Sequence, residues 1–370
     1  MPKPKVFLIC TGVGHINRGY ESFTLECFEN LKTSNKFELF LLKGGGSNQH
    51  HHLKIACIKR NSALGTFINK VTGKEKYWVE QLTFLFGMLP ALLKYKPSVI
   101  YYSDFVLGTF LWQLRRFFGF KYQLLFSNGA PNGPPFTRMD HLQQLLPMYV
   151  KEAELAGTPS AKQTLLPYAI TINKEKNRAL IADKANLMQK LKLPTNKKII
   201  ICVGAVNSHH KRIDYLINEF SLIDSNNYFL IVLGQIDEQS TSIILQAKQQ
   251  LPNNNYLIQQ VAGNDVVNYL AVADYFILPS LNEGLPRVLP EALAAGLLPI
   301  VHNYTVTQET LKGYGVFKNM TATGILQDAI DEVDARNIGK QTLIDFAFNN
   351  YSWDKLVAKY EDMMVKNIYK

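Results

Sequence analysis

An α/β fold built from two Rossmann-like domains is predicted by three features of the sequence. The chain has 370 residues, of which 47% are hydrophobic and 19% charged, so it is too long for one ordinary domain and can fill large cores. Short apolar runs alternate with helical patterns over residues 6–126. A second series of the same kind covers residues 198–301. Such alternation is typical of a parallel sheet flanked by helices, and two series indicate two sheets.

Each expected element follows from the spacing of its apolar residues. In the first half, the expected strands are residues 6–10, 37–42, 98–102 and 122–126, and the expected helices are residues 20–31 and 108–117. In the second half, the expected strands are residues 199–203, 228–233, 256–258, 275–278 and 298–301, and the expected helices are residues 214–223, 242–250, 266–271 and 291–296.

Four segments are expected along the chain: an N-terminal domain over residues 1–170, a linker over 171–197, a second domain over 198–345 and a C-terminal helix over 346–370. The linker is placed where the sequence is rich in Lys and Asn and ends in the turn signal Pro194-Thr195-Asn196. Ser352 is a suitable N-cap for the last helix, whose apolar residues recur at helical spacing.

Composition limits the classes of protein. The longest apolar stretch, residues 84–93, is broken by Gly87 and Pro90 and falls short of the roughly 20 residues that span a bilayer. The apolar run near the N-terminus enters a Gly-rich turn without a cleavage site, so it is interpreted as a strand of a cytoplasmic protein. A formal net charge of +10 suits anionic partners, which are nucleotide phosphates, an anionic membrane surface or nucleic acid.

Neither the cysteines nor the histidine tract predicts a metal site. The four cysteines have no metal-ligand spacing and are interpreted as single buried thiols. Residues 50–52 are three histidines beside three glycines at residues 44–46. They are either a metal-binding tract or a loop, and a loop is favoured because no cysteine or carboxylate spacing accompanies them.

The most informative stretch contains two carboxylates eight positions apart, Glu283 and Glu291. A strand is expected to end at Pro279, and a helix to begin near Pro290, since proline is favoured in a first turn. In an open α/β sheet, this strand-to-helix corner binds ligands, and its free amides favour a pyrophosphate. Glu291 is then either an acid stabilised by the helix dipole or a ligand of a ribose diol.

This stretch resembles the E-x7-E motif of the retaining family four glycosyltransferases, with Pro279-Ser280 before it and Glu-Ala-x-Ala-x-Gly from Glu291 to its end. The resemblance implies the GT-B fold, in which two Rossmann-like domains face each other across a cleft and a C-terminal helix crosses back to the first domain. It implies that Glu283 lies by the donor sugar and that Glu291 binds the nucleotide ribose. Gly284 and Leu285 are the other donor-binding candidates of this loop.

Residues 203–217 resemble the family's phosphate-binding segment. Gly204 ends the strand, and Lys211 matches the basic residue that neutralises the leaving diphosphate, which makes Lys211 a catalytic candidate beside Glu283. Ala205 stands where the family often has Arg, and Arg212 is expected to compensate as a donor-binding residue. The other interpretation of Lys211 and Arg212 is a solvated start of a helix.

The Gly-rich turn after the first strand is interpreted as a donor-binding loop. A dehydrogenase fingerprint would need glycine at Asn17 and an acid at Lys43, so that class is rejected. The glycines followed by an arginine instead resemble the mobile first loop of the transferases. Gly12, Gly14 and Arg18 are therefore donor-binding candidates, and the alternative is a tight turn with a surface Arg.

Three further candidates lie in the first half. Asn128 stands where many relatives have an active-site His, and it is the third catalytic candidate, able to bond a sugar hydroxyl. Asp104 and His141 are the acceptor-side candidates. Asp104 is equally explained as a helix cap, and His141 as a residue that covers the interface.

The resemblance implies transfer of a sugar from a nucleotide-diphosphate sugar to an acceptor hydroxyl with retention of the anomeric configuration. A UDP-sugar is favoured and a GDP-sugar comes next. No Asp-x-Asp motif is present, so no metal ion and no cofactor are expected. The alternatives are an epimerase or a phosphorylase of the same fold, and a non-catalytic binder of sugar nucleotides.

The acceptor, expected to be a saccharide, a lipid or a small molecule, is not defined by the sequence. Aromatic and basic residues at 77–78, 84–86 and 112–118 suit either peripheral contact with the inner face of a membrane or the packing of helix cores. No nucleic acid is expected as a partner, because no recognised nucleic-acid-binding module is present.

Overall fold

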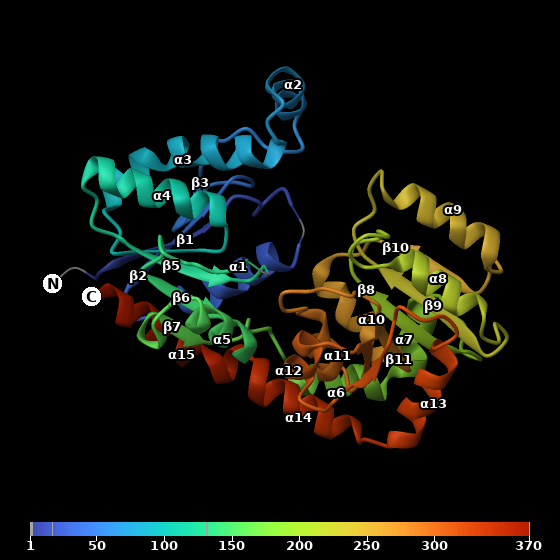
Figure 1. Ribbon diagram of the computed structural model, residues 1–370. Helices are drawn as coiled ribbons and strands as arrows, with labels where there is room; N and C mark the ends of the chain where they lie inside the picture. Colours follow the sequence, from blue (N-terminus) through green and yellow to red (C-terminus); the bar gives the residue numbers. More distant parts are fainter. Residues whose placement is uncertain (1–2, 17, 131, 370) are drawn as a thin grey trace. The chain divides into compact units, whose positions relative to one another are not determined.

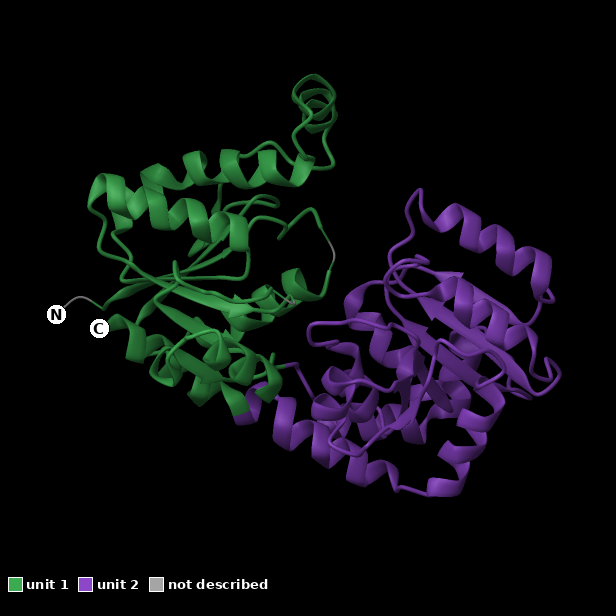
Figure 2. Cartoon of the chain, viewed as in Figure 1, with its two compact units in different colours: residues 1–169, 356–370 green, residues 170–355 purple. Residues whose placement is uncertain are grey.

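The computed structural model describes residues 3–16, 18–130 and 132–369. Two compact units make up the chain: unit 1 is Met1–Ala169 with Leu356–Lys370, and unit 2 is Ile170–Lys355 (Figure 2). Each unit is a parallel β-sheet with helices on both faces (Figure 1). The predicted fold class, two α/β domains, is confirmed.

The sheet of unit 1 has seven strands in the order β3-β2-β1-β4-β5-β6-β7, and all neighbours are parallel. Its strands are β1 (Lys5–Cys10), β2 (Glu38–Lys43), β3 (His52–Lys54), β4 (Val99–Tyr102), β5 (Gln123–Asn128), β6 (His141–Gln144) and β7 (Gln163–Leu165). Residues 6–8 of β1 are fully buried, as expected for a strand covered on both faces.

Helices cover this sheet on both sides (Figure 1). The helices of unit 1 are α1 (Gly19–Leu31), α2 (Ala63–Thr72), α3 (Lys76–Tyr95), α4 (Phe105–Phe118) and α5 (Pro147–Leu155), joined by the C-terminal helix α15 (Trp353–Ile368). α3 and α4 pack on one face, where Phe84 and Leu111 join Phe7 and Ile9 in the hydrophobic core. α1 and α15 lie on the other face, where Phe23 of α1 contacts Tyr360 of α15.

The sheet of unit 2 has six parallel strands in the order β10-β9-β8-β11-β12-β13. These are β8 (Lys198–Val203), β9 (Tyr228–Leu233), β10 (Tyr256–Gln259), β11 (Tyr275–Leu278), β12 (Pro299–His302) and β13 (Val316–Lys318). The helices are α6 (Lys174–Ala182), α7 (Lys184–Lys190), α8 (Ile213–Ser221), α9 (Ser240–Gln250), α10 (Val266–Val272), α11 (Val288–Ala294), α12 (Thr305–Leu311), α13 (Leu326–Arg336) and α14 (Lys340–Tyr351).

The segment expected to be a linker, residues 171–197, is instead an ordered part of unit 2. It forms α6 and α7, which pack against α10. Leu187, Met188 and Leu193 are buried in the core of unit 2. The Lys- and Asn-rich composition reflects the exposed faces of these helices, while a few apolar side chains supply the packing.

The C-terminal segment also differs from the expected division. Residue 346 lies inside α14, and the last helix begins at Trp353. Ser352 caps that helix, since its Oγ accepts a hydrogen bond from Lys355 N at 3.3 Å. From Leu356 onward the helix belongs to unit 1, where the Tyr360 hydroxyl donates to Pro167 O at 2.9 Å.

None of the helices in the described parts of the chain combines the length and the apolar character needed to cross a membrane. The cysteines are free thiols. Burial raises the pKa of the Cys57 thiol to about 11, and it raises the pKa values of the Cys10, Cys27 and Cys202 thiols as well. These thiols are therefore protonated at neutral pH.

Candidate functional site

The loops that follow β8 and β11 lie side by side at the carboxyl edge of the sheet in unit 2. The strand order reverses between these two neighbours, because β9 and β10 continue on one side and β12 and β13 on the other. In doubly wound sheets, ligands bind at such a switch point. The loop after β8 is residues 204–212, and the loop after β11 is residues 279–287.

Asn207 folds the first of these loops. Its Oδ1 accepts hydrogen bonds from His210 N at 3.0 Å and from Lys211 N at 2.9 Å. Its backbone oxygen accepts from Ile213 N at 3.1 Å. The loop is thereby closed into a turn that fixes where the Lys211 side chain leaves the backbone.

Lys211 and Glu283 form an ion pair between the two loops, joining Lys211 Nζ to Glu283 Oε1. Both side chains are largely buried, at 14% and 8% exposure. His210 Nε2 lies 3.7 Å from the other carboxylate oxygen of Glu283. The structure thus brings together two of the three predicted catalytic residues.

Gly204 is needed where Lys211 crosses the end of β8. A Cβ atom at Gly204 would lie 2.9 to 3.1 Å from three methylene carbons of the Lys211 side chain. The neighbouring Gly234 is constrained more strictly, since its Cβ would lie 1.8 Å from the backbone oxygen of Gly204. Gly204 therefore leaves room for the Lys211 side chain, and its donor contact stays a prediction.

Arg212 joins the two loops through backbone carbonyls. Its Nη1 donates to Pro279 O at 3.3 Å and to Met320 O at 2.6 Å, and its guanidinium lies 4.3 Å from the Tyr215 ring centroid. These contacts account for a cation at the start of α8. They do not support the expected role of Arg212 as a substitute for the family's phosphate-binding Arg.

The remaining donor candidates of unit 2 lie around the second loop. Gly284 is half-buried and Leu285 buried, directly after Glu283. α11 begins at Val288, so Glu291 lies in its first turn, and the Glu291 side chain is half-buried. Glu283 and Glu291 are therefore carried by one short strand-to-helix connection, as the motif implies.

The chemistry of this site is that of a paired cation and carboxylate shielded from water. An incoming phosphate would offer Lys211 a new anionic partner, and charge-assisted bonds of this kind are strong in a partly buried site. Among the residues that the structure describes, no group of three or more His, Cys, Asp or Glu is arranged to hold a metal ion.

In unit 1 the switch point lies between β1 and β4, and the first loop follows β1. Gly12 and Gly14 are required there by packing inside the unit. A Cβ at Gly12 would lie 2.2 Å from Glu21 Oε1, and one at Gly14, whose φ is +90°, would lie 2.4 Å from the carbonyl carbon of Gly45. Packing against Glu21 and against the glycine loop at residues 44–46 thus gives a structural reason for Gly12 and Gly14, and donor binding by these glycines stays a prediction.

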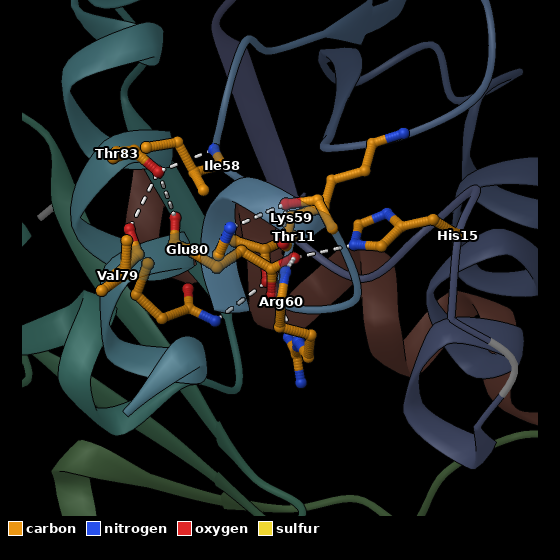
Figure 3. Close-up of polar contacts among 11 residues, drawn as sticks. Thr11, His15, Ile58, Lys59, Arg60, Val79, Glu80 and Thr83 are labelled. Carbon is orange, nitrogen blue, oxygen red and sulfur yellow. Dashed lines mark hydrogen bonds and ion pairs between the residues drawn. The ribbon is translucent and has the colours of Figure 1, made fainter. Parts of the chain in front are cut away.

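A buried carboxylate anchors this first loop (Figure 3). Glu80 of α3 has no exposed surface, and His15 Nε2 lies 2.8 Å from its Oε1. The same carboxylate pairs with the Arg60 guanidinium and accepts from Arg60 N at 3.1 Å. Glu80 thus connects the loop after β1 with the segment that leads into α2.

Two more charged side chains lie near this cluster. Arg18 is exposed at the start of α1. Burial raises the pKa of the Glu21 carboxyl, and the positive charges of Arg18 and Arg60 offset part of that rise. Donor binding by the exposed Arg18 stays a prediction.

Asp104 is the N-cap of α4, the alternative foreseen for it, because its Oδ1 accepts from Leu107 N at 2.8 Å. Burial raises the pKa of its carboxyl to about 6, although hydrogen bonds from the backbone of Leu107 and Val106 and the charge of Arg60 act in the opposite direction. The carboxyl is thus poised to change protonation just below neutral pH.

We expect Asp104→Asn to remove a pH dependence of stability. The folded-state pKa is above the unfolded value, so the native state binds more protons between pH 3.8 and about 6, and wild-type stability falls as the pH rises through that window. The loss should amount to about 2 kcal/mol. Asn keeps the capping bond and does not titrate. Urea unfolding at pH 4, 5 and 7 measures the free energy of unfolding of both proteins. The same pH dependence in the wild type and in Asp104→Asn would contradict the prediction.

Asn128 and His141 lie inside the sheet of unit 1. His141 has no exposed surface, and its Nε2 lies 2.7 Å from Thr164 Oγ1, so the prediction of an acceptor-side His141 is not supported. Asn128 is 1% exposed and donates to Gln144 Oε1 at 2.9 Å. Its Oδ1 has no partner among the described residues, so a sugar contact by Asn128 stays a prediction.

Sequence reasoning missed Asn207, His210, Glu80, Arg60 and His15. The signal for Glu80 was present, because a carboxylate within the apolar run of a helix requires a buried partner. His15 directly follows Gly14 in the Gly-rich loop after β1. Asn207 and His210 carried no signal of their own beyond their position next to Lys211.

The part of unit 2 that carries the loops after β8 and β11 matches a known protein family. Residues 183–333 match the model of the family described as Glycosyl transferases group 1. This range lies inside unit 2 and includes Lys211, Glu283 and Glu291. The part of unit 2 that carries the Lys211–Glu283 pair is therefore similar to the glycosyl transferases group 1 family.

Curated relatives match part of the chain. A glycogen synthase of Mycoplasma mobile is 26% identical over 212 residues, which are 52% of this chain and 43% of that protein. An alpha-galactosylglucosyldiacylglycerol synthase of Streptococcus pneumoniae is 26% identical over 241 residues, 62% of each chain. The chain thus spans less than two thirds of the length of these relatives.

Solved structures match nearly the whole chain. The sucrose-phosphate synthase of Thermosynechococcus elongatus superposes with a TM-score of 0.78 over 98% of both chains at 17% identity. Anabaena HepE in complex with UDP-glucose gives a TM-score of 0.72 over 97% of this chain and 99% of its own, at 12% identity. At these identities the likeness concerns the fold, which is the two-domain GT-B fold of glycosyltransferases.

Proposed function

We propose that the chain is a retaining glycosyltransferase of family four. It transfers a sugar from a nucleotide-diphosphate sugar to an acceptor hydroxyl without a metal ion. A UDP-sugar is the preferred donor, followed by a GDP-sugar. The observation that carries the proposal is the Lys211–Glu283 ion pair at the switch point of unit 2, where residues 72 positions apart meet.

The ion pair has a direct role in the proposed reaction. Before the donor binds, each charge neutralises the other in a site with little water. When the donor binds, its diphosphate forms an ion pair with the ammonium group of Lys211 in place of Glu283. The Glu283 carboxylate can then accept hydrogen bonds from hydroxyl groups of the donor sugar. As the glycosidic bond breaks, negative charge grows on the leaving diphosphate, where the fixed lysine stabilises it. The leaving phosphate takes the proton of the acceptor hydroxyl.

Glu291 supplies the nucleotide end of the site. Its carboxylate accepts hydrogen bonds from the two ribose hydroxyls, and its place in the first turn of α11 fixes it relative to Glu283. The HepE relative was solved with UDP-glucose, which supports a uridine nucleotide here. The diacylglycerol-linked name of one curated relative supports a saccharide or a lipid as acceptor.

Donor binding tests the proposal directly. We expect UDP-glucose, with EDTA present, to stabilise the protein by about 2.7 kcal/mol at 100 times its dissociation constant. Glu291→Ala should abolish this stabilisation, whereas Glu238→Ala, which removes an exposed carboxylate of the same unit, should not. Thermal unfolding with UDP-, GDP- and ADP-glucose measures both effects and identifies the nucleotide.

The product distinguishes the proposed reaction from its alternatives. Slow donor hydrolysis with the anomeric configuration retained, followed by NMR, is the expected outcome for a retaining transferase. Conversion of the donor sugar into its epimer would identify an epimerase. Stabilisation without any turnover would identify a binding protein, and loss of stabilisation on adding EDTA would contradict metal independence.

A further inference from the structure

Helix α2 of unit 1 exposes nearly all of its apolar side chains. Leu64, Phe67 and Val71 are 54%, 62% and 68% exposed, and Gly65 is the buried residue of this helix. The three exposed residues follow helical spacing and therefore share one face. α2 extends from the rest of unit 1 beyond the start of α3 (Figure 1). An exposed apolar stripe of this kind normally marks an interaction surface.

The helix is well defined although it packs on little. Ser62 caps its start by accepting from Gly65 N at 3.1 Å, and Gly73 ends it in the left-handed conformation with φ 68°. A ten-residue helix is marginal in water without packing. Its apolar face would therefore gain stability from an apolar surrounding.

Positive charge also predominates in the chain beside this helix. Residues 54–76 carry six Lys and Arg against one Glu, a formal +5. Lys70 and Lys74 are exposed at the C-terminal end of α2. The partner of this surface must accept both hydrocarbon side chains and positive charge.

We propose that α2 docks the protein on the surface of an anionic lipid membrane. Leu64, Phe67 and Val71 enter the boundary between headgroups and acyl chains, and Lys70 and Lys74 contact the anionic headgroups. A nucleic acid would satisfy the charge and leave the apolar face in water. A membrane satisfies both features at once, and this helix lies outside the stretches that the sequence singled out for membrane contact.

Vesicle binding of the full chain tests the proposal without any assay of sugar transfer. We expect binding to vesicles of phosphatidylcholine with about 30% phosphatidylglycerol, and at least about tenfold weaker binding to phosphatidylcholine alone. Roughly 0.5 M NaCl should weaken binding to the anionic vesicles strongly, since the Debye length shrinks to a few Å.

Two variants separate the contributions of the helix. Replacing Leu64, Phe67 and Val71 together by Ser should weaken binding at least about tenfold, because each apolar side chain contributes to insertion. Lys70→Glu with Lys74→Glu should weaken it about as much. The matched control is Leu245→Ser with Lys248→Glu on α9 of unit 2, where Leu245 is also 54% exposed. This control should bind like the wild type.

The depth to which α2 enters the membrane is measured by tryptophan fluorescence after the substitution Phe67→Trp. The Phe67→Trp protein should show a blue shift and quenching by brominated lipid on anionic vesicles. Equal binding by the wild type and the serine variant, or binding that does not depend on anionic lipid, would overturn the proposal. The proposal would also be overturned if the wild type were a dimer that does not bind vesicles and the serine variant were a monomer. The exposed face of α2 would then pair with a second copy of the chain. Unchanged circular dichroism verifies folding.

Discussion

Lys211→Ala is expected to lower the turnover number of sugar transfer by about 10² to 10³, the loss seen when one fixed donor to a developing negative charge is removed. The KM for the donor should rise less, because the charge on the diphosphate grows as the bond breaks. Stability should fall, because the buried Glu283 loses its cation, while the backbone of the loop is still held by Asn207 and Arg212. Steady-state kinetics with the donor identified by thermal unfolding measure this.

Two matched variants make the result specific to charge placement. Lys211→Arg keeps the cation and should recover part of the turnover. Lys318→Ala removes another largely buried lysine of unit 2, one that pairs with Asp328 and Glu332 on the sheet edge, and should leave turnover within about twofold. A Lys211→Ala enzyme with wild-type turnover would exclude Lys211 from the chemistry, even if donor binding were retained.

Strands buried on both faces are the elements that the sequence predicts best. Residues 199–202 have no exposed surface, and a continuous apolar run of that length between turn signals has few other interpretations. Helix limits are harder to predict. α11 begins at Val288, before the apolar spacing that starts at residue 291, and Pro290 lies in its first turn as expected.

Polar strands and helices escaped prediction for a physical reason. Strand β6 contains a histidine and two glutamines, and all of its residues are buried. Gln143 Nε2 donates to Leu166 O at 2.8 Å, and Gln144 Nε2 donates to Gln163 Oε1 at 2.9 Å. Such side chains can be buried only because residues distant in sequence form hydrogen bonds with them. The local spacing of residues does not predict those partners.

The candidate site was predictable to the extent that motifs carry it. Glu283 and Glu291 lie on one connection, so their spacing alone brings them to the same corner. Lys211 is predicted by the resemblance of residues 203–217 to a phosphate-binding segment. Its contact with Glu283 arises because β8 and β11 are neighbours in the sheet. The glycines of the first loop also pack against Glu21 and Gly45, a structural reason for them that their spacing does not reveal.

Glu80→Ala is expected to destabilise unit 1 by about 3 to 5 kcal/mol, the cost of breaking a buried ion pair from one side. The substitution would leave the guanidinium of Arg60, 15% exposed, without its carboxylate, and it would release His15 from α3. Urea unfolding followed by tryptophan fluorescence measures this, since Trp78 lies on the same helix. Glu80→Gln should cost less, because the amide oxygen can still accept from Arg60.

The control for this effect is an exposed pair in the same unit. Glu29 and Lys32 pair on the surface of α1, and Glu29→Ala should change stability by less than about 1 kcal/mol. A Glu80→Ala protein as stable as the Glu29 variant would mean that the cluster in Figure 3 relaxes without cost. Glu80 would then not hold the loop after β1, and the position of His15 would have to be set by its contacts with the glycine loop at residues 44–46.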